Sequence, residues 1–464
     1  MVKPNPFIIV ESTRFSAFDP FKVKNIVWLK ALISCNKFTT AFSNSSSMDS
    51  FPRSLNPNKH LREQFVSNLP GSSMLEVSAL LNNVALLMLL RHTFCSQTVN
   101  DACRSLKSYL ASVALDYVFL VLPTLLIFTV LAEWVYICLI GLLLLLVFFT
   151  AVKRTYSLPY MEGPNASRAS ISSYRVVTMF ITCLCILAVD FRIYPREYAK
   201  TETYGASLMD LGVGSFVLMN AVTSRQARNI KSSMSWWKAA FKSTTPLLLL
   251  GFARLASTLS LDYQVHVGEY GVNWNFFFTL AGVSILTSIL NVPAEYSGIL
   301  GSVILVGYWG MYLVGVQVSY YLFFENHTTK QRSKHETRIR ICFLTIMFWI
   351  LTLLIDRYVE RISRRMCNLA YVTWVVAQNL QLLALRLLAD NIIGHKTLCL
   401  ERAFDRNLLA SFLVANLLTG LVNLSVDTIF VSPLSAVLIL VSYSLTLCVV
   451  MVLIDFSGVK YKFW

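Results

Sequence analysis

The chain has 464 residues, of which 55% are hydrophobic and only 14% are charged. A soluble domain carries about 25% charged residues, so this composition excludes an ordinary soluble protein and requires lipid as part of the solvent. The formal net charge is +15. Because the lysines and arginines lie mostly in short loops between apolar segments, they indicate anchoring at anionic lipid headgroups and not nucleic-acid binding.

The first 73 residues differ from the rest of the chain. They are polar, rich in Ser, Asn and Pro, and contain no apolar run long enough for a signal peptide. This composition predicts a polar N-terminal tail over residues 1–73 that is disordered at least to residue 47. Residues 74–464 then form one multi-spanning membrane domain.

Residues 74–464 hold a near-continuous series of apolar segments. Lipid offers no hydrogen bonds to a backbone, and a barrel would show alternating apolar residues, so the predicted fold is all-α and polytopic. Several segments fall short of the ~20 residues needed to cross the ~30 Å hydrocarbon core. The candidate spans are 75–91, 113–130, 131–151, 174–190, 206–223, 243–260, 274–291, 298–319, 341–356, 366–389, 408–426 and 434–455.

The charge pattern leaves the orientation of these spans open. The basic loop 225–242 favours the cytosol. Loops 330–340 and 357–365 are both basic as well, however, and a single short span separates them. Charge cannot place both on the same side of the membrane.

The first polar stretch that packing does not explain is DFRIYPREYAKTETY at 190–204. Pro195 interrupts any helix there. Charge runs are usually solvated loops, yet ionisable groups at a membrane boundary are costly and tend to be functional. The candidate site residues in this stretch are Asp190, Arg192, Arg196, Glu197, Lys200 and Tyr204.

The second is Asp210, which lies inside the predicted span 206–223. Neighbouring glycines are explained by close helix packing, but an aspartate is not. Arg254, in the next predicted span, is a candidate partner that would neutralise it. A buried structural ion pair and a functional role are equally compatible with this pattern.

The third is HVGEYGVNWNFFF at 266–278, just before a predicted span. It combines His266, Glu269, Tyr270 and Asn275. An aromatic belt with polar caps is one interpretation, and a site for a polar headgroup is the other. No phosphate loop, Ser-His-Asp signature, HExxH or zinc-ligand spacing occurs, so no metal site is predicted.

Two classes of function fit these features. A transporter of an anionic or lipid-linked substrate would carry charges at the midplane and often internal repeats. A membrane-embedded transferase would hold its charged residues near one face, where a lipid headgroup meets a soluble donor. The charges cluster at span ends and no convincing repeat is present, which favours the enzyme, with the transporter as the alternative.

Several blocks of the sequence resemble the inositol acyltransferases of glycosylphosphatidylinositol (GPI) anchor synthesis, the Gwt/PIG-W family. They are AVDFRIYPREYAKTETYGASLMDLGVGSFV (188–217), STTPLLLLGFARL (243–255), HVGEYGVNWNFFFTL (266–280), LLASFLVANLLTGLVNLS (408–425) and LREQFVSNLPGSSMLEV (61–77). The resemblance covers roughly 61–455. It implies a multi-pass endoplasmic reticulum protein with about thirteen spans. Together with the twelve candidate spans, this predicts about 12–13 transmembrane helices.

The resemblance also implies an activity. The family transfers a fatty acyl chain, typically palmitoyl, from acyl-CoA to the inositol of glucosaminyl-phosphatidylinositol. Its favoured catalytic pair, an aspartate and a lysine ten residues apart, matches Asp190 and Lys200. We expect Asp190 to act as the base and Lys200 to orient it or stabilise the oxyanion. Arg192 and Arg196 are candidates for binding phosphate groups.

The remaining candidates are expected to bind the substrate. His266, Glu269 and Tyr270 are candidates for the glycan headgroup. Asn273 stands where the family pattern has a histidine, and asparagine cannot act as a base near neutral pH. The other predicted substrate-binding residues are Glu197, Tyr204, Asp210, Arg254 and Asn275. The expected partners are acyl-CoA as co-substrate, glucosaminyl-phosphatidylinositol and membrane lipid, with no bound cofactor.

Overall fold

The computed structural model describes residues 61, 64, 65, 67, 69–94, 106–156, 166–228, 236–260, 274–304, 307–324, 332–393 and 397–458. Most of the predicted tail 1–73 therefore lies outside the described residues. His266, Glu269, Tyr270 and Asn273 also lie outside them.

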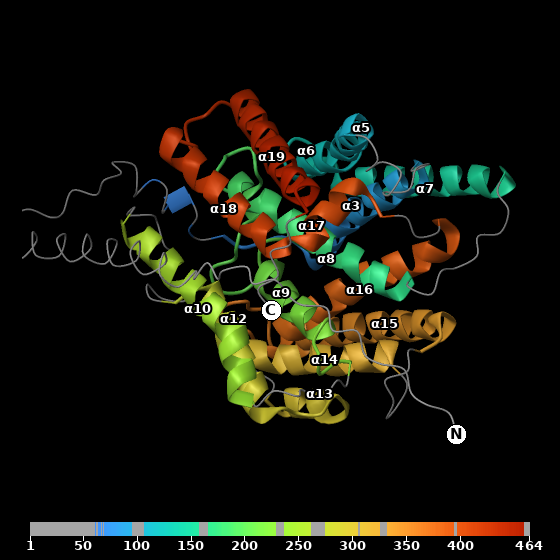
Figure 1. The fold of residues 1–464 in the computed structure, drawn as a ribbon, viewed down its shortest axis with the longest axis vertical. Coiled ribbons are helices and arrows are strands. Elements are labelled where there is room, and N and C mark those ends of the chain that lie inside the picture. The colour runs from blue at the N-terminus through green and yellow to red at the C-terminus, as the bar shows by residue number, and fades with distance from the viewer. Residues whose placement is uncertain are drawn as a thin grey trace, which may run out of the picture. The chain divides into compact units, whose positions relative to one another are not determined.

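The described residues confirm the predicted all-α fold (Figure 1). The described part consists of α-helices with three brief π or 3₁₀ turns. The elements are α3 (Met74–Phe94), α5 (Leu106–Asp116), η1 (Tyr117–Val121), α6 (Leu122–Phe128), η2 (Ala132–Trp134), α7 (Val135–Tyr156), α8 (Ala166–Ala188), η3 (Arg196–Tyr198), α9 (Leu211–Val222), α10 (Trp236–Ser260), α12 (Phe276–Leu290), α13 (Ala294–Ile304), α14 (Tyr308–Phe323), α15 (Lys334–Tyr358), α16 (Leu369–Ile393), α17 (Cys399–Arg406), α18 (Leu408–Ser425) and α19 (Pro433–Phe456).

Eight helical segments of the described part are long and apolar enough to cross a membrane, which makes this a multi-pass membrane protein. They are Met74–Phe94, Lys107–Phe128, Ala132–Val152, Ala169–Ala188, Lys334–Tyr358, Leu369–Asp390, Leu408–Ser425 and Pro433–Phe456. The predicted spans 206–223 and 274–291 correspond to α9 and α12, which have 12 and 15 residues. The predicted span 243–260 lies within α10.

One predicted span is wrong. Residues 298–319 do not form a single helix. Helix α13 ends at Ile304, and α14 begins at Tyr308, directly after Gly307 (φ +96°). The two short helices pack along each other. Their contact is close: a Cβ on Gly301 would lie 2.8 Å from the carbonyl oxygen of Gly310. Hydropathy sees only a continuous apolar run here and cannot detect the reversal.

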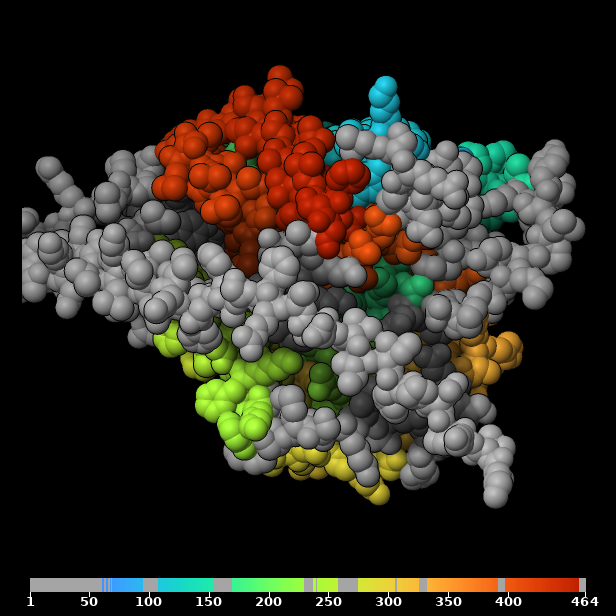
Figure 2. Space-filling view, viewed as in Figure 1, coloured from blue at the N-terminus to red at the C-terminus, as the bar shows by residue number. Residues whose placement is uncertain are grey.

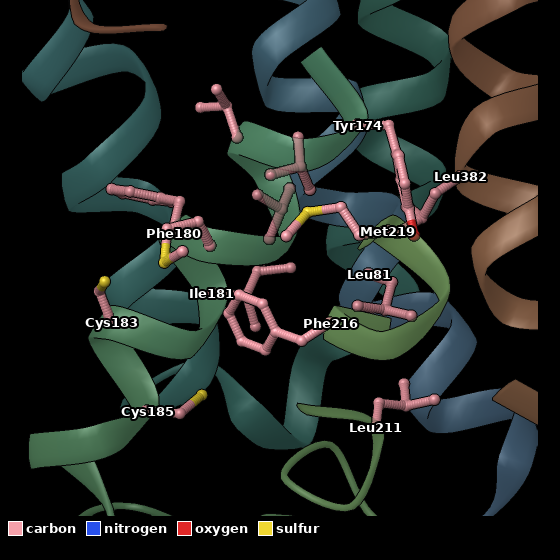
Figure 3. Close-up of a cluster of buried hydrophobic side chains, with 14 of the residues drawn as sticks. Leu81, Tyr174, Phe180, Ile181, Cys183, Cys185, Leu211, Phe216, Met219 and Leu382 are labelled. Carbon is pink, nitrogen blue, oxygen red and sulfur yellow. The ribbon is translucent and has the colours of Figure 1, made fainter. Parts of the chain in front are cut away.

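The core forms around α16, the most buried of the eight segments. Helices α3, α8, α9 and α15 all pack against it. Figure 3 shows Leu81, Phe180 and Phe216, from α3, α8 and α9, meeting in this core. By contrast, α7 and α15 bury little of their surface and present apolar side chains outward, as lipid-facing helices do.

Helices α18 and α19 lie on the outside of the molecule, where Figure 2 shows their side chains in orange and red. Most of their exposed residues are apolar, as expected for a lipid-facing surface. They include Leu417, Leu421, Leu424, Leu434, Leu438 and Leu445. The opposite face of α18 packs against α8.

Small residues hold α9 between two neighbours. A Cβ on Gly214 would lie 2.9 Å from the hydroxyl of Tyr371 on α16. On the other side, a Cβ on Gly315 of α14 would lie 2.8 Å from the Cβ of Ala221 on α9. These close approaches fix the position of α9, and with it the position of the loop that leads into its first residue.

Candidate functional site

Three segments meet at one end of the helices and are called here the loop platform: residues 69–73 before α3, 189–210 between α8 and α9, and 359–368 between α15 and α16. Main-chain bonds join them. The N–H of Gly205 donates to the carbonyl of Ile362 at 2.9 Å, and that of Ser72 donates to the carbonyl of Ala206 at 2.8 Å. The platform is therefore one hydrogen-bonded surface.

Two glycines allow the first two segments to cross. Gly71 and Gly205 have φ angles of +80° and +129°, which side chains rarely adopt. A Cβ on Gly71 would lie 2.6 Å from the carbonyl oxygen of Ala206, and one on Gly205 would lie 2.4 Å from that of Pro70. At this crossing neither segment has room for a side chain in place of its glycine.

The side chain of Asp210 links two segments of the platform, 189–210 and 359–368. Its carboxylate is fully buried, and Oδ1 accepts from Nε of Arg364 at 2.7 Å. Oδ2 accepts from the Thr201 hydroxyl at 2.8 Å. Burial raises the pKa of Asp210, while Arg364 and Thr201 oppose this rise. The prediction of Arg254 as its partner is wrong, since Arg254 is exposed on α10.

The partner of Asp210 was missed because it lies in the basic loop 357–365, where several arginines look alike in sequence. The folded path of the backbone brings Arg364, among the arginines of this loop, to Asp210. The Arg364 side chain is 5% exposed. Tyr371, at the start of α16, reinforces the contact by donating its hydroxyl to the main-chain carbonyl of Asp210 at 2.8 Å. The second polar stretch of the sequence is thus a buried structural ion pair.

Asp190 and Lys200 both lie on the loop platform. Asp190 follows the last turn of α8, and its side chain is partly exposed. Its Oδ2 accepts from the amide Nδ2 of Asn423 on α18 at 2.7 Å. Lys200 follows η3 in the same loop and is also partly exposed. The platform therefore places both predicted catalytic side chains beyond the end of α8, each partly exposed.

Arg196 holds this loop together instead of pointing outward. Its Nη2 donates to the carbonyls of Val189, Phe191 and Tyr194 at 2.8, 3.1 and 3.0 Å. The guanidinium also lies 4.0 Å from the centre of the Phe65 ring. Burial lowers the pKa of Arg196 to about 10, and Tyr194 opposes that shift. These contacts give Arg196 a structural part in the loop, and its role in phosphate binding stays a prediction.

Arg192 is the more accessible of the two arginines predicted to bind phosphate. Its side chain is exposed, and its guanidinium lies 6.0 Å from the centre of the Phe430 ring. Tyr204 is exposed too, with its hydroxyl 3.8 Å from the sulfur of Met366. Both residues therefore remain available at the surface of the platform.

Glu197 lies beside another carboxylate. Its side chain is exposed, and partial burial together with the charge of Glu76 raises its pKa. Glu76, in the first turn of α3, accepts from the hydroxyl of Tyr198 at 2.9 Å. The start of α3 thus contributes an acidic side chain next to η3.

Asn275 has a structural part at the start of α12. Its Oδ1 accepts from the backbone N–H groups of Phe277 and Phe278, which makes it the N-cap. Its Nδ2 donates to the carbonyl of Gly251 on α10 at 2.9 Å. The buried side chain of Asn275 thus links α12 to α10. Among the described residues it makes no hydrogen bond to the loop platform.

Ionisable residues at the opposite helix ends escaped the sequence analysis. Arg91 pairs with the buried Asp116 at 2.9 Å, and His92 lies 3.4 Å from Glu401. Further ion pairs join Arg386 to Asp390, and Arg402 and Arg406 to Asp455. Arg91, Asp390 and Asp455 are charges near the end of apolar helices, a signal that could have revealed them.

Comparison with known proteins covers most of the chain. Residues 58–306 and 298–454 match the sequence model of the GWT1 family. An uncharacterised Arabidopsis thaliana protein is 52% identical over 77% of this chain and 90% of its own length. The glucosaminyl-phosphatidylinositol-acyltransferase PIGW of Bos taurus is 31% identical over 88% and 99% of the two chains. The GPI-anchored wall transfer protein 1 of Candida albicans is 33% identical over 84% and 96%. With matches of this extent, the chain belongs to the GWT1 family.

Proposed function

We propose that this protein is an O-acyltransferase of GPI-anchor biosynthesis. It transfers a fatty acyl chain, with palmitoyl expected, from acyl-CoA to an inositol hydroxyl of glucosaminyl-phosphatidylinositol in the endoplasmic reticulum membrane. The observation that carries this proposal is the match, over nearly the full length of the relative, to a protein named glucosaminyl-phosphatidylinositol-acyltransferase. The multi-pass helical fold suits two lipid-linked substrates.

The reaction is proposed to proceed by direct attack on the thioester. Asp190 removes the proton from the inositol hydroxyl while its oxygen attacks the acyl carbonyl carbon. Lys200 stabilises the negative charge on the carbonyl oxygen. The C–S bond then breaks, and the CoA sulfur leaves with the proton as a thiol. A positioned base is typically worth about 10²–10⁴ in rate, and an oxyanion donor contributes on a similar scale, about 10²–10³.

The placement of the charged groups supports this reaction. Asp190, Lys200 and Arg192 are on the loop platform, beyond the end of α8, and each is at least partly exposed. In this proposal, the lipid headgroup approaches the platform from the membrane surface. Arg192 is proposed to bind a phosphate of CoA or of the lipid, since a guanidinium pairs with phosphate oxygens.

Complementation with lipid analysis tests the proposal. The chain and its Asp190→Asn and Lys200→Ala variants are expressed in cells that lack the inositol acyltransferase. We expect the parent chain to restore inositol-acylated glucosaminyl-phosphatidylinositol and both variants to fail at normal protein level. Glu133→Gln, at an exposed carboxylate on η2, is the matched control and should restore it. Microsomes given labelled palmitoyl-CoA then identify the donor.

A parent chain that accumulates in the reticulum but forms no acylated lipid contradicts the proposal. The Asn273→His variant, which supplies the family's histidine, separates two cases. Acylation regained by that variant would limit the loss to this one position, whereas continued absence would leave the transporter as the better assignment.

A further inference from the structure

The carboxylate of Asp190 has a partner on a distant helix. Nδ2 of Asn423 donates to its Oδ2 at 2.7 Å, across 233 positions of sequence. An ionised carboxylate only accepts hydrogen bonds, so the NH₂ group of the amide has to face it. Oδ1 of Asn423 is buried and has no partner among the described residues. Among the described residues, the Asn423 side chain therefore makes its hydrogen bond to Asp190.

The helix that carries Asn423 is held firmly in place. Tyr443, on α19, donates its hydroxyl to the carbonyl of Cys183 on α8 at 2.7 Å and lies 3.5 Å from that of Ala415 on α18. The Phe412 ring packs against aromatic rings from α9 and α12. These contacts hold α18 against α9, α12 and α19, and Tyr443 links it to α8.

Asp190 itself lies on a loop and not on a helix. It lies two residues beyond the end of α8, in the turn that begins the loop platform. A carboxylate in such a turn can rotate about its side-chain torsions, and terminal torsions of this kind are broad. A hydrogen bond from a residue on a packed helix restricts that rotation, and sites supported in this way are more precise than sites built on loops alone.

We propose that Asn423 is a positioning residue for the acyl transfer: it holds the carboxylate of Asp190 in the orientation needed to take the proton of the inositol hydroxyl. This inference rests on the proposed function, in which Asp190 is the base. Asn423 acts through Asp190 and takes no part in binding either substrate.

The first test compares two asparagines on α18. Asn423→Leu keeps the branching of the side chain at Cγ and removes its donor. Asn416→Leu is the matched control, because Nδ2 of Asn416 donates, among the described residues, to the carbonyl of Phe412 at 2.7 Å within its own helix. We expect Asn423→Leu to lower kcat about 100-fold, the scale of a 1 Å misplacement, without changing KM for either substrate. Asn416→Leu should keep the parental kcat.

Two further variants keep the test decisive if Asn423→Leu is poorly made. Asn423→Gln retains an NH₂ donor and should keep more activity than the leucine variant at equal protein level. Asn423→Asp has the same shape but places a second carboxylate against Asp190, so we expect it to be less active than Asn423→Gln. Parental kcat in Asn423→Leu or in Asn423→Asp overturns the proposal, and so does a raised KM with kcat retained.

A double-variant cycle separates positioning from an independent role. In the Asp190→Asn background the base is already lost, so adding Asn423→Leu should lower the residual rate no further. Multiplied losses would overturn the proposal. The cycle also separates the two ideas: parental turnover in Asp190→Asn defeats the catalytic role of Asp190, whereas loss in Asp190→Asn with parental turnover in Asn423→Leu defeats only the positioning role of Asn423.

Discussion

Nε of Arg364 lies 2.7 Å from Oδ1 of Asp210, although the two residues are 154 positions apart. Both side chains are buried, at 5% and 0% exposure. The pair joins two of the three segments of the loop platform. Because removing one member of a buried pair leaves the other charge without compensation, this contact should be a main determinant of the stability of the platform.

We expect Arg364→Met to lower the free energy of unfolding by about 3–5 kcal/mol, because Asp210 keeps a buried charge without its partner. Thermal unfolding in detergent measures the change. Arg254→Met is the matched control: that arginine is exposed on α10, and surface substitutions usually stay within about 0.5 kcal/mol. Equal losses in the two variants would contradict the assignment of Arg364 as the partner.

Arg196→Lys should loosen the turn after α8. A lysine carries one ammonium group and cannot reproduce the planar fork that reaches three carbonyls. We expect a loss of about 1.5–3 kcal/mol, the range for hydrogen bonds to charged groups, and faster amide exchange over residues 191–198. Hydrogen exchange measured by mass spectrometry reports both.

The same change at the exposed Arg192 is the control, since its described contact is the ring of Phe430 at 6.0 Å. Arg192→Lys should leave exchange over residues 191–198 unaltered. If Arg196→Lys exchanges at the parental rate, the three carbonyl bonds do not stabilise the turn.

Gly205→Ala should destabilise the protein, because its Cβ would lie 2.4 Å from the carbonyl oxygen of Pro70 and φ is +129°. Backbone strain alone costs about 1–3 kcal/mol, and the overlap adds to it. Gly420→Ala, on α18, has nothing within 4 Å of the new Cβ and should gain up to about 1 kcal/mol from helix propensity. Thermal unfolding of the two variants should move in opposite directions. A neutral Gly205→Ala would mean that the segments do not cross as described.

The Cys367 thiol should resist alkylation in the folded protein. It is 5% exposed, and burial raises its pKa to about 12. The thiolate is the reactive form, so reaction with iodoacetamide at pH 8 should be very slow and should accelerate only as the pH approaches the raised pKa. Peptide mass spectrometry compares native protein with denatured protein, in which Cys367 should react readily. Equal labelling of the two samples would contradict the burial of this thiol.

The helical pattern was predictable because a continuous run of apolar residues indicates a membrane helix. The predicted span 131–151 corresponds to η2 and α7, and 434–455 lies within α19. The hairpin of α13 and α14 was not predictable in that way. Its two helices are equally apolar, and the reversal depends on close contact between Gly301 and Gly310, which hydropathy does not register.

The site was predictable in kind and not in its contacts. Asp190 and Lys200 came from a charged motif at a span end, together with a family resemblance. The partners did not: Arg364 is one of several arginines in its loop, and Asn423 lies inside an apolar helix where an asparagine has many structural explanations. Which side chains meet depends on how distant helices pack, and sequence spacing carries no such information for residues this far apart.

The distances between these partners along the chain also set a timetable for biogenesis. At about 5–20 residues per second, the 233 positions that separate Asp190 from Asn423 take roughly 10–50 s to translate. During that interval the nascent chain already carries Asp190 and Lys200 but lacks the helix that orients the carboxylate. Arg364 emerges in the same interval, after Asp210 has been inserted without its countercharge. A stalled or prematurely released chain would thus contain the whole charged motif and still be unable to assemble it, which makes the late helices a checkpoint for the maturation of the protein.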